Sequence, residues 1–227
     1  MENNIFYKRT KISLFLQKIV SKFINKKFRL ADKKDISDIL KLYHICNKDL
    51  VLSYPKKEEE IANILNQFFI SVNKKTFFDF PKIIGLIEFR TLQNGGLTQE
   101  KIREFTSNPG IIEIDARIKK LYNEEINKLV YFKRVLTHPD YRKKRVSSRL
   151  KIALGVLLWS QGYRYVTGII RIYPKPNNTS LKVHLQKDES RLVGTIHQTG
   201  EDGQDYIFGI FHYDLRKQLF SKIINGI

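Results

Sequence analysis

The residues best suited to chemistry form a dense group of cations between two predicted elements. Residues 138–150 read HPDYRKKRVSSRL, and five of these thirteen residues are Arg or Lys. They follow the apolar run LVYFKRVL and lead into an apolar-periodic helix. A helix N-terminus leaves four backbone N–H groups unpaired and carries about half a positive charge, which suits phosphate oxygens. The pattern predicts a phosphate-binding turn; the alternatives are a helix start decorated with charge and a nucleic-acid patch.

This turn resembles the pyrophosphate-binding turn of the GNAT N-acyltransferase superfamily, whose pattern is Q/R-x-x-G-x-G/A. Arg142 stands at the Q/R position, Arg145 at the first glycine and Ser147 at the second. The preceding VLTHPDYR resembles the V-x-P-x-Y-R lead-in of many members, and the likeness covers about residues 27–215. The resemblance implies acetyl-CoA or a longer acyl-CoA as co-substrate, and it implies no metal.

The resemblance also implies how the donor is held. Backbone groups of the strand before the turn would pair with the pantetheine arm, and the turn would hold the diphosphate. A second segment, NNTSLKVHLQK, resembles the N-x-x-S/A…Y/H segment that follows the fifth strand of GNAT proteins. The residues implied for donor binding are Val135, Leu136, Thr137, Arg142, Lys143, Lys144, Arg145, Val146, Ser147, Ser148, Asn177 and Ser180.

Three residues are candidates for proton transfer: His184, Glu88 and Tyr131. His184 stands where many relatives have a Tyr that protonates the departing thiolate, and an imidazole with a pKa of about 6.5 could do the same. A surface histidine without a role is the equal alternative. Relatives often have a Glu base on the fourth strand, where this chain has Lys133 or Tyr131, and Glu88 on the preceding strand could reach the same cleft. A water chain is an equal alternative for the base.

Hydrophobic periodicity predicts an order of elements that agrees with this resemblance. Strands are predicted at 27–31, 75–80, 82–92, 128–137, 163–173, 191–199 and 205–215, and helices at 10–28, 32–46, 56–72, 145–161 and 178–187. The predicted fold class is α/β, a GNAT-like mixed sheet of about seven strands flanked by helices. A basic amphipathic helix (1–26) precedes the acyltransferase domain (27–227), and residues 93–129 form an insertion between the third and fourth strands.

The charge predicts an anionic partner, because 41 basic and 23 acidic residues give a net charge of +18. The helix predicted at 10–28 has one apolar face and one lysine-rich face, so it either packs on the domain or lies on an anionic membrane. An acidic acyl carrier protein as donor would also suit the charge, whereas nucleic acid is less favoured. The acceptor would be an amine-bearing molecule of unknown identity.

The remaining composition narrows the location and the chemistry. The single cysteine, Cys46, cannot form an internal disulfide, and no apolar run is long enough for a spanning helix. The N-terminus does not read as a signal peptide, so we expect a cytoplasmic protein, with peripheral membrane contact as a further expectation. Two functions stay open: an N-acyltransferase acting by direct attack of an amine, or a non-catalytic GNAT-like module whose basic face binds nucleic acid or anionic membrane.

Overall fold

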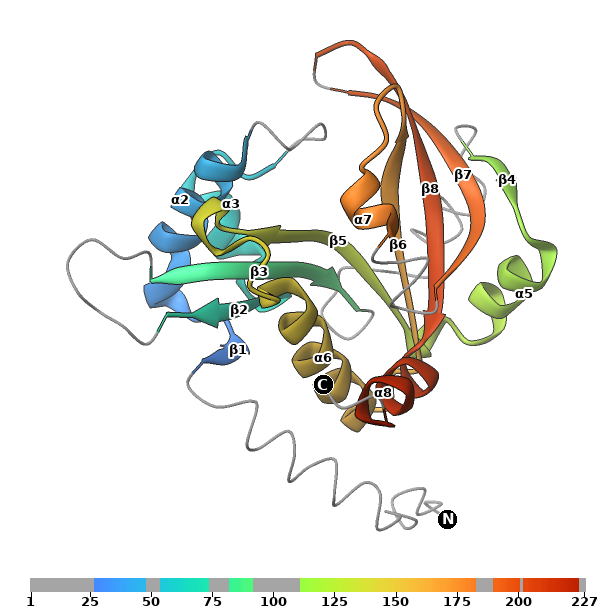
Figure 1. Ribbon diagram of the computed structural model, residues 1–227, viewed down its shortest axis with the longest axis horizontal. Helices are drawn as coiled ribbons and strands as arrows, with labels where there is room; N and C mark the ends of the chain where they lie inside the picture. Colours follow the sequence, from blue (N-terminus) through green and yellow to red (C-terminus); the bar gives the residue numbers. More distant parts are fainter. Residues whose placement is uncertain are drawn as a thin grey trace.

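The computed structural model of this chain describes residues 27–47, 54–73, 82–91, 111–182, 190–200 and 202–224 (Figure 1). The predicted N-terminal helix, the strand predicted at 75–80 and residues 93–110 of the insertion lie outside these residues. The strands are β1 (Phe28–Leu30), β2 (Phe68–Val72), β3 (Ile83–Arg90), β4 (Ile111–Ile114), β5 (Leu129–Thr137), β6 (Tyr165–Tyr173), β7 (Arg191–Thr199) and β8 (Asp205–Asp214). The α-helices are α2 (Ile36–Cys46), α3 (Glu58–Asn63), α5 (Ala116–Glu124), α6 (Val146–Ser160), α7 (Asn178–Lys182) and α8 (Leu215–Ile224).

The described strands form one mixed sheet in the order β1-β2-β3-β5-β6-β8-β7-β4. β5 and β6 run parallel, and the other neighbouring pairs run antiparallel. The predicted fold class is confirmed, with helices on both faces of a mixed sheet. The sheet has eight strands rather than about seven, because residues 111–114 of the insertion form β4, which pairs with β7 at the edge.

The helix predicted at 56–72 is wrong in its second half. Helix α3 ends at Asn63, and Phe68–Val72 form strand β2 between β1 and β3. Periodicity does not separate a short apolar run in a helix from a buried strand, and the aromatic and β-branched residues of FFISV favour the strand. Helix α8 was not predicted. Asp214 caps its N-terminus, because its carboxylate accepts hydrogen bonds from the backbone N–H groups of Arg216 and Lys217.

Helices cover both faces of the sheet. On one face α6 contributes Leu150 and Leu154 to a core with Ile87 and Phe132. On the other face α2 and α3 pack over the β2–β3–β5 end of the sheet, where the core residues include Tyr43, Ile61, Leu86 and Leu136.

Helix α5 lies on the same face as α2, farther along the sheet. Its Tyr122 packs with Leu129 of β5 and donates a hydrogen bond of 2.8 Å to Thr167 of β6, while Ile118 packs with Ile169 and Ile210. No described helix is long and apolar enough to cross a membrane.

Candidate functional site

The parallel strands β5 and β6 part in the middle of the sheet. Their register runs from Leu129 opposite Tyr165 to Phe132 opposite Gly168, and it ends there. Beyond this point β5 continues to Thr137 in its pairing with β3, and β6 continues to Tyr173 in its pairing with β8. Figure 1 shows the two strands diverging from a shared lower end. The gap between them leaves the second half of β5 unpaired on the β6 side, next to the residues for which the resemblance implied contact with the pantetheine arm.

A bulge in β5 accounts for this divergence, and a glycine in β6 allows close pairing just before it. Glu88 of β3 lies opposite Arg134, whereas Phe89 lies opposite Phe132, so Lys133 is the extra residue of a β-bulge. A bulge bends its strand and increases the local twist, which turns the rest of β5 away from β6. At the last paired position the strands are close, because a Cβ on Gly168 would lie 3.0 Å from the carbonyl oxygen of Phe132.

The register of β5 decides which backbone groups face the gap. The His138 amide donates to the Ile84 carbonyl at 3.0 Å. In an antiparallel pair every second residue bonds to the partner strand, so the backbone groups of His138, Leu136 and Arg134 bond to β3. Val135 and Thr137 therefore direct their amides toward the gap, although the Thr137 carbonyl also lies 3.7 Å from the Cys46 thiol. Leu136 belongs to the β3 ladder and the core, so of the three residues predicted to contact the pantetheine arm, only Val135 and Thr137 direct their amides toward the gap.

The basic turn lies between the end of β5 and the start of α6. A 3-10 turn (Pro139–Tyr141) is followed by Arg142–Arg145, and the first helical bond runs from the Arg149 amide to the Arg145 carbonyl at 3.0 Å. The amides of residues 146–148 precede that bond, so they are the donors of a helix N-terminus. The absence of a Cβ on Gly85 lets α6 sit close on β3, because an added Cβ would meet Val146 at 2.8 Å.

Arg145 has a left-handed backbone conformation, which glycine adopts more easily than any other residue. Its φ is 59° and its ψ is 20°, and Lys143 also has a positive φ of 62°. Left-handed backbone costs a residue with a Cβ roughly 1–2 kcal/mol, which glycine avoids. The turn thus has a conformation that favours glycine at the place where the GNAT pattern has its first glycine, and it carries an arginine side chain there.

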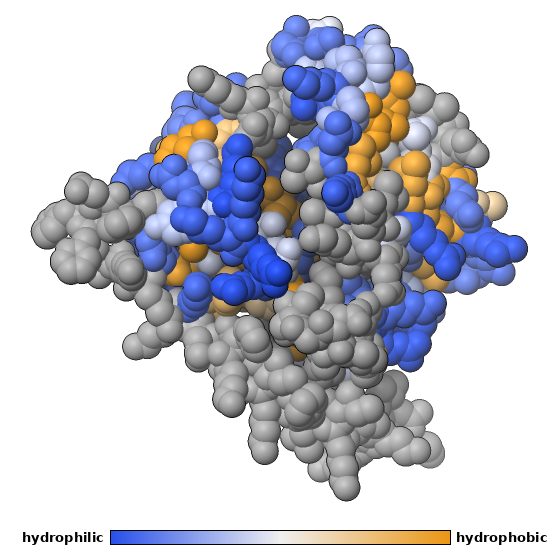
Figure 2. Space-filling view, viewed as in Figure 1, coloured by the Kyte–Doolittle hydropathy of each residue, from blue (hydrophilic) through white to orange (hydrophobic). Residues whose placement is uncertain are grey.

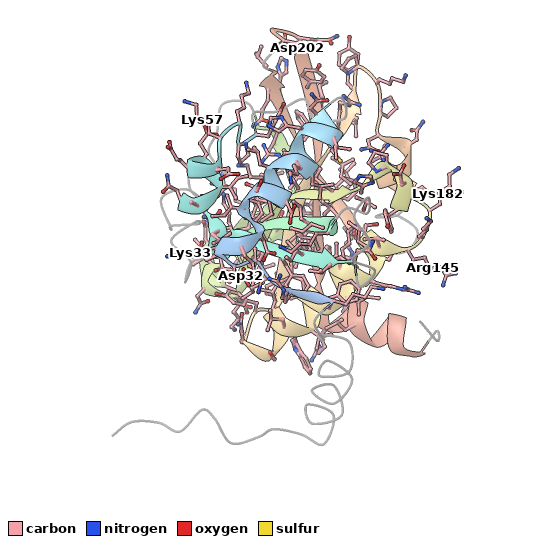
Figure 3. All side chains as sticks on the ribbon, turned by 90° about the vertical axis from the view of Figure 1, so that its left-hand side faces the viewer. Asp32, Lys33, Lys57, Arg145, Lys182 and Asp202 are labelled. Carbon is pink, nitrogen blue, oxygen red and sulfur yellow. The ribbon has the colours of Figure 1, made fainter. Side chains whose placement is uncertain are left out.

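The cations of the turn point to solvent. Arg142, Lys143, Lys144 and Arg145 are all exposed, and Lys144 places its ammonium 4.8 Å from the centre of the Tyr141 ring. Figure 3 shows Arg145 and Lys182 of α7 on the same side of the molecule, both extending outward. Figure 2 shows hydrophilic side chains gathered in the middle of the face that Figure 1 presents, beside smaller apolar areas.

The second motif is described only in part. Asn177 is exposed, its amide donates to the Arg171 carbonyl, and its carbonyl accepts from Leu181 at the start of α7. The side chain of Ser180 and the whole of His184 lie outside the described residues, so their predicted roles stay predictions.

Glu88 is the centre of a buried ionic cluster. Its side chain is 0% exposed and accepts hydrogen bonds from Tyr43 (2.6 Å) and Arg134 (2.5 Å), while the Lys133 ammonium lies 2.8 Å from its other oxygen. Burial acts to raise the pKa of this carboxyl, but the charges of Arg134 and Lys133 outweigh it and hold the pKa below its ordinary value. A carboxylate fixed between two cations is a poor proton acceptor, so the geometry does not favour Glu88 as a direct base.

Tyr131 is half-buried and lies on the same face of the sheet as Glu88 and Arg134. Its partner on β3 is Arg90. Burial raises the pKa of its phenol to about 12, against the opposing effect of the Arg134 charge. At neutral pH this phenol keeps its proton, so it can act as a hydrogen-bond donor or an acid but not as a base.

Sequence reasoning missed the partners of Glu88. Tyr43 and Arg134 stand 45 and 46 residues from it in the chain, and neither has a local motif. The available signal was an acid inside the apolar strand IIGLIEFR, since a buried carboxylate needs partners of opposite charge or hydrogen-bond donors.

No protein-family model and no curated protein matches the sequence. Solved structures do match in fold. A putative phosphinothricin N-acetyltransferase is 17% identical with a TM-score of 0.57, covering 83% of this chain and 97% of its own. A putative acetyltransferase from Salmonella typhimurium, solved with acetyl-CoA, is 14% identical with a TM-score of 0.55, covering 83% of this chain and 92% of its own.

A third match is a GNAT superfamily phosphinothricin acetyltransferase from Sinorhizobium meliloti in complex with acetyl-CoA. It is 15% identical with a TM-score of 0.52, covering 82% of this chain and 86% of its own. Likeness at these identities concerns the fold, and the fold is that of the GNAT N-acetyltransferases.

Proposed function

Because the chain has the GNAT fold, we propose that it is an N-acyltransferase that uses acetyl-CoA or a longer acyl-CoA. One observation carries the proposal: the gap between β5 and β6 lies beside the basic turn that opens α6. A thioester with an extended arm and a diphosphate needs unpaired strand amides at one end and a phosphate site at the other. Val135 and Thr137 supply the first, and residues 142–148 supply the second.

The reaction would be a direct displacement. The acceptor nitrogen forms a bond to the thioester carbonyl carbon, the carbon–sulfur bond breaks, the amine proton passes to water, and the coenzyme leaves as a thiolate that then takes up a proton. A backbone N–H near the Lys133 bulge would polarise the carbonyl oxygen. Since Glu88 is held by Arg134 and Lys133, a water molecule is the better candidate for the base. Positioning of the two substrates is then the main source of rate.

The donor's carrier and chain length are the finer part of the proposal. The exposed cations of the turn, together with Lys182 on the same side of the molecule, suit an acidic acyl carrier protein as well as free coenzyme A. A carrier protein would deliver the phosphopantetheine arm to the same gap between β5 and β6. Competition between acyl carrier protein and coenzyme A for one site would support this extension.

The test is calorimetric titration of the full chain with acetyl-CoA. The double variant Arg142→Ala/Lys144→Ala should weaken binding about tenfold or more, because hydrogen bonds to charged groups contribute about 1.5–3 kcal/mol each. The matched control is Lys33→Ala/Lys57→Ala, which removes the same charge from two exposed lysines far from the turn, as Figure 3 shows. Failure of the wild-type chain to bind acetyl-CoA would reject the proposal.

One observation favours the second candidate, a non-catalytic binding module. Arg145 has the left-handed backbone of a glycine but carries a long side chain at the helix start, where the diphosphate would approach. The same titration with a short DNA duplex and with anionic vesicles separates the two functions. Binding of these ligands, impaired by the turn variant and unaccompanied by acetyl-CoA binding, would favour the module.

A further inference from the structure

Positive charge is concentrated where β5 bends away from β6, on the face of the sheet that α2 and α5 share. The Lys133 bulge lies there, between Arg134 on the α2 side and Tyr131 on the α5 side. Arg90 lies opposite Tyr131, two residues beyond Glu88 on β3, so its side chain belongs to the same face. The site is distinct from the donor turn, which begins α6 on the opposite face.

The charges at this place do not balance. Among the described residues, the carboxylate in contact with the cluster is Glu88, and two cations already bind it. Arg90 is a third cation: it lies opposite Tyr131 in the β3–β5 register, and its charge acts on Tyr131 and Lys133. Its buried Nε atom has no hydrogen-bond partner among the described residues. The cluster therefore holds more positive charge than its own carboxylate can neutralise.

Lys133 is the more accessible of the two cations that Glu88 holds. Its side chain is 27% exposed, whereas those of Arg134 and Glu88 are 7% and 0% exposed. Burial lowers the pKa of its ammonium, and the charges of Arg134 and Arg90 add to that effect against the opposing effect of Glu88. Lys133 and Arg134 share the single carboxylate of Glu88, so this partly buried charge is only partly neutralised, and an incoming anion would reduce the cost of burying it.

We propose that Arg90 and Lys133 form a subsite for an anionic group, a carboxylate or a phosphate, carried by the amine acceptor. The inference rests on the acyl transfer proposed above, since it assigns the class of acceptor. An acceptor held there by its anion lies next to the point where the strands part, so its amine can approach a thioester in the gap from the face opposite α6. Arg134 is the inner cation, which fixes Glu88 and thereby the Lys133 side chain.

Direct binding tests the subsite without any acyl transfer. The full chain, with and without added coenzyme A, is titrated with inorganic phosphate and separately with acetate, which tells the two anions apart. Lys133→Gln and Arg90→Gln should each weaken binding of the preferred anion about tenfold or more. The matched control is Lys120→Gln, which removes the same charge from a 74% exposed lysine of α5. Equal affinities in all four proteins would mean binding by surface lysines only and would overturn the subsite.

A second experiment measures acetyl transfer to amines with and without an anionic group. Ethanolamine is compared with phosphoethanolamine, and glycinamide with glycine, as acceptors of the acetyl group. The wild-type ratio of kcat/KM should favour at least one anionic amine by about tenfold or more, and Lys133→Gln should bring that ratio near one. Lys133→Arg keeps the charge and should retain the preference, and circular dichroism verifies the fold of each variant.

The failures of the two proposals look different. If the chain binds acetyl-CoA but Lys133→Gln and Arg90→Gln change neither anion affinity nor the acceptor ratio, the subsite is wrong and the acyltransferase stands. If anion affinity depends on Arg90 and Lys133 while acetyl-CoA does not bind, the anion-binding site is supported. Its role in holding an acceptor amine is then rejected together with the proposed acyl transfer.

Discussion

Tyr43 of α2 donates a hydrogen bond of 2.6 Å to Glu88 of β3, and both side chains are 0% exposed. The same carboxylate holds Arg134 and Lys133 on the neighbouring strand. One helix and two strands are thus connected through a single carboxylate at the bulge from which the gap opens. The burial of Glu88 makes it a residue that organises the site rather than one that meets substrate.

Glu88→Gln should destabilise the protein more than Tyr43→Phe does. Removing the carboxylate leaves Arg134 and Lys133 without a counter-charge, which costs about 3–5 kcal/mol, whereas removing the phenol hydroxyl costs about 1–3 kcal/mol. Urea denaturation of both variants measures the difference in the free energy of unfolding. Equal losses would show that the charge of Glu88 adds nothing beyond one hydrogen bond.

His184→Ala should lower turnover by about 10²–10⁴-fold while the affinity for acetyl-CoA stays nearly unchanged, since a general acid acts on the departing thiolate only. His184→Tyr should restore part of the rate, because a phenol can also supply the proton. Tyr131→Phe is the comparison, since its phenol keeps its proton at neutral pH. A large loss in Tyr131→Phe together with full activity in His184→Ala would transfer the role to Tyr131.

Arg145→Gly should stabilise the fold by about 1 kcal/mol, because glycine adopts the left-handed backbone of this position without the steric cost of a Cβ. Arg142→Gly removes the same charge at a φ of −63°, where glycine gains nothing and only adds freedom to the unfolded chain. Guanidinium denaturation of both variants gives the comparison. If the free energy of unfolding of Arg145→Gly is no higher than that of Arg142→Gly, the backbone of Arg145 is not strained.

Gly168→Ala should both destabilise the sheet and weaken donor binding. The added Cβ would lie 3.0 Å from the backbone oxygen of Phe132, so the last β5–β6 pair would have to move apart. Overpacking of this kind costs about 1–3 kcal/mol. Gly162→Ala is the control, because its Cβ would meet nothing within 4 Å and its cost comes from its positive φ alone. The free energy of unfolding and the Kd for acetyl-CoA are the readouts, and an unchanged Kd would separate the strand junction from the donor site.

Stability should fall as the pH drops from about 6.5 to 4, and His212 should contribute to the loss. Burial against Tyr122 and Tyr165 lowers the pKa of this imidazole to about 4, from an ordinary value of about 6.5. Between these values the unfolded chain binds the proton and the folded chain does not, so acid favours unfolding by about 3 kcal/mol over the window.

The variant His212→Phe places another aromatic ring at this position, and this ring has no group that binds a proton. Its free energy of unfolding should therefore depend less steeply on pH than that of the wild type between pH 4 and 6.5. Parallel pH profiles for the two proteins would contradict the buried neutral state of His212.

The sequence predicted features that depend on local pattern. Helix α6 and the basic turn follow from periodicity and from residues that stand side by side in the chain, whereas the mixed sheet was implied by the resemblance to the GNAT superfamily. Strand β2 was missed because FFISV has an apolar pattern that a buried helix shares. The Glu88 cluster was missed because its members come from α2, β3 and β5. The bulge at Lys133 depends on the register between two strands, and a single sequence does not give that register.

Strand β4 follows β3 in the chain, yet it lies at the opposite end of the sheet beside β7. During synthesis β4 and α5 leave the ribosome well before β7, which begins at Arg191. At about 5–20 residues per second, the partner strand arrives seconds later. The pairing edge of β4 must stay unpaired for that interval, although Tyr122 of α5 can pack earlier on Leu129 and Tyr165. Strand β4 is therefore an unpaired strand edge in the nascent chain until β7 and β8 join the sheet, and a chaperone that binds unpaired edges would act on it during that interval.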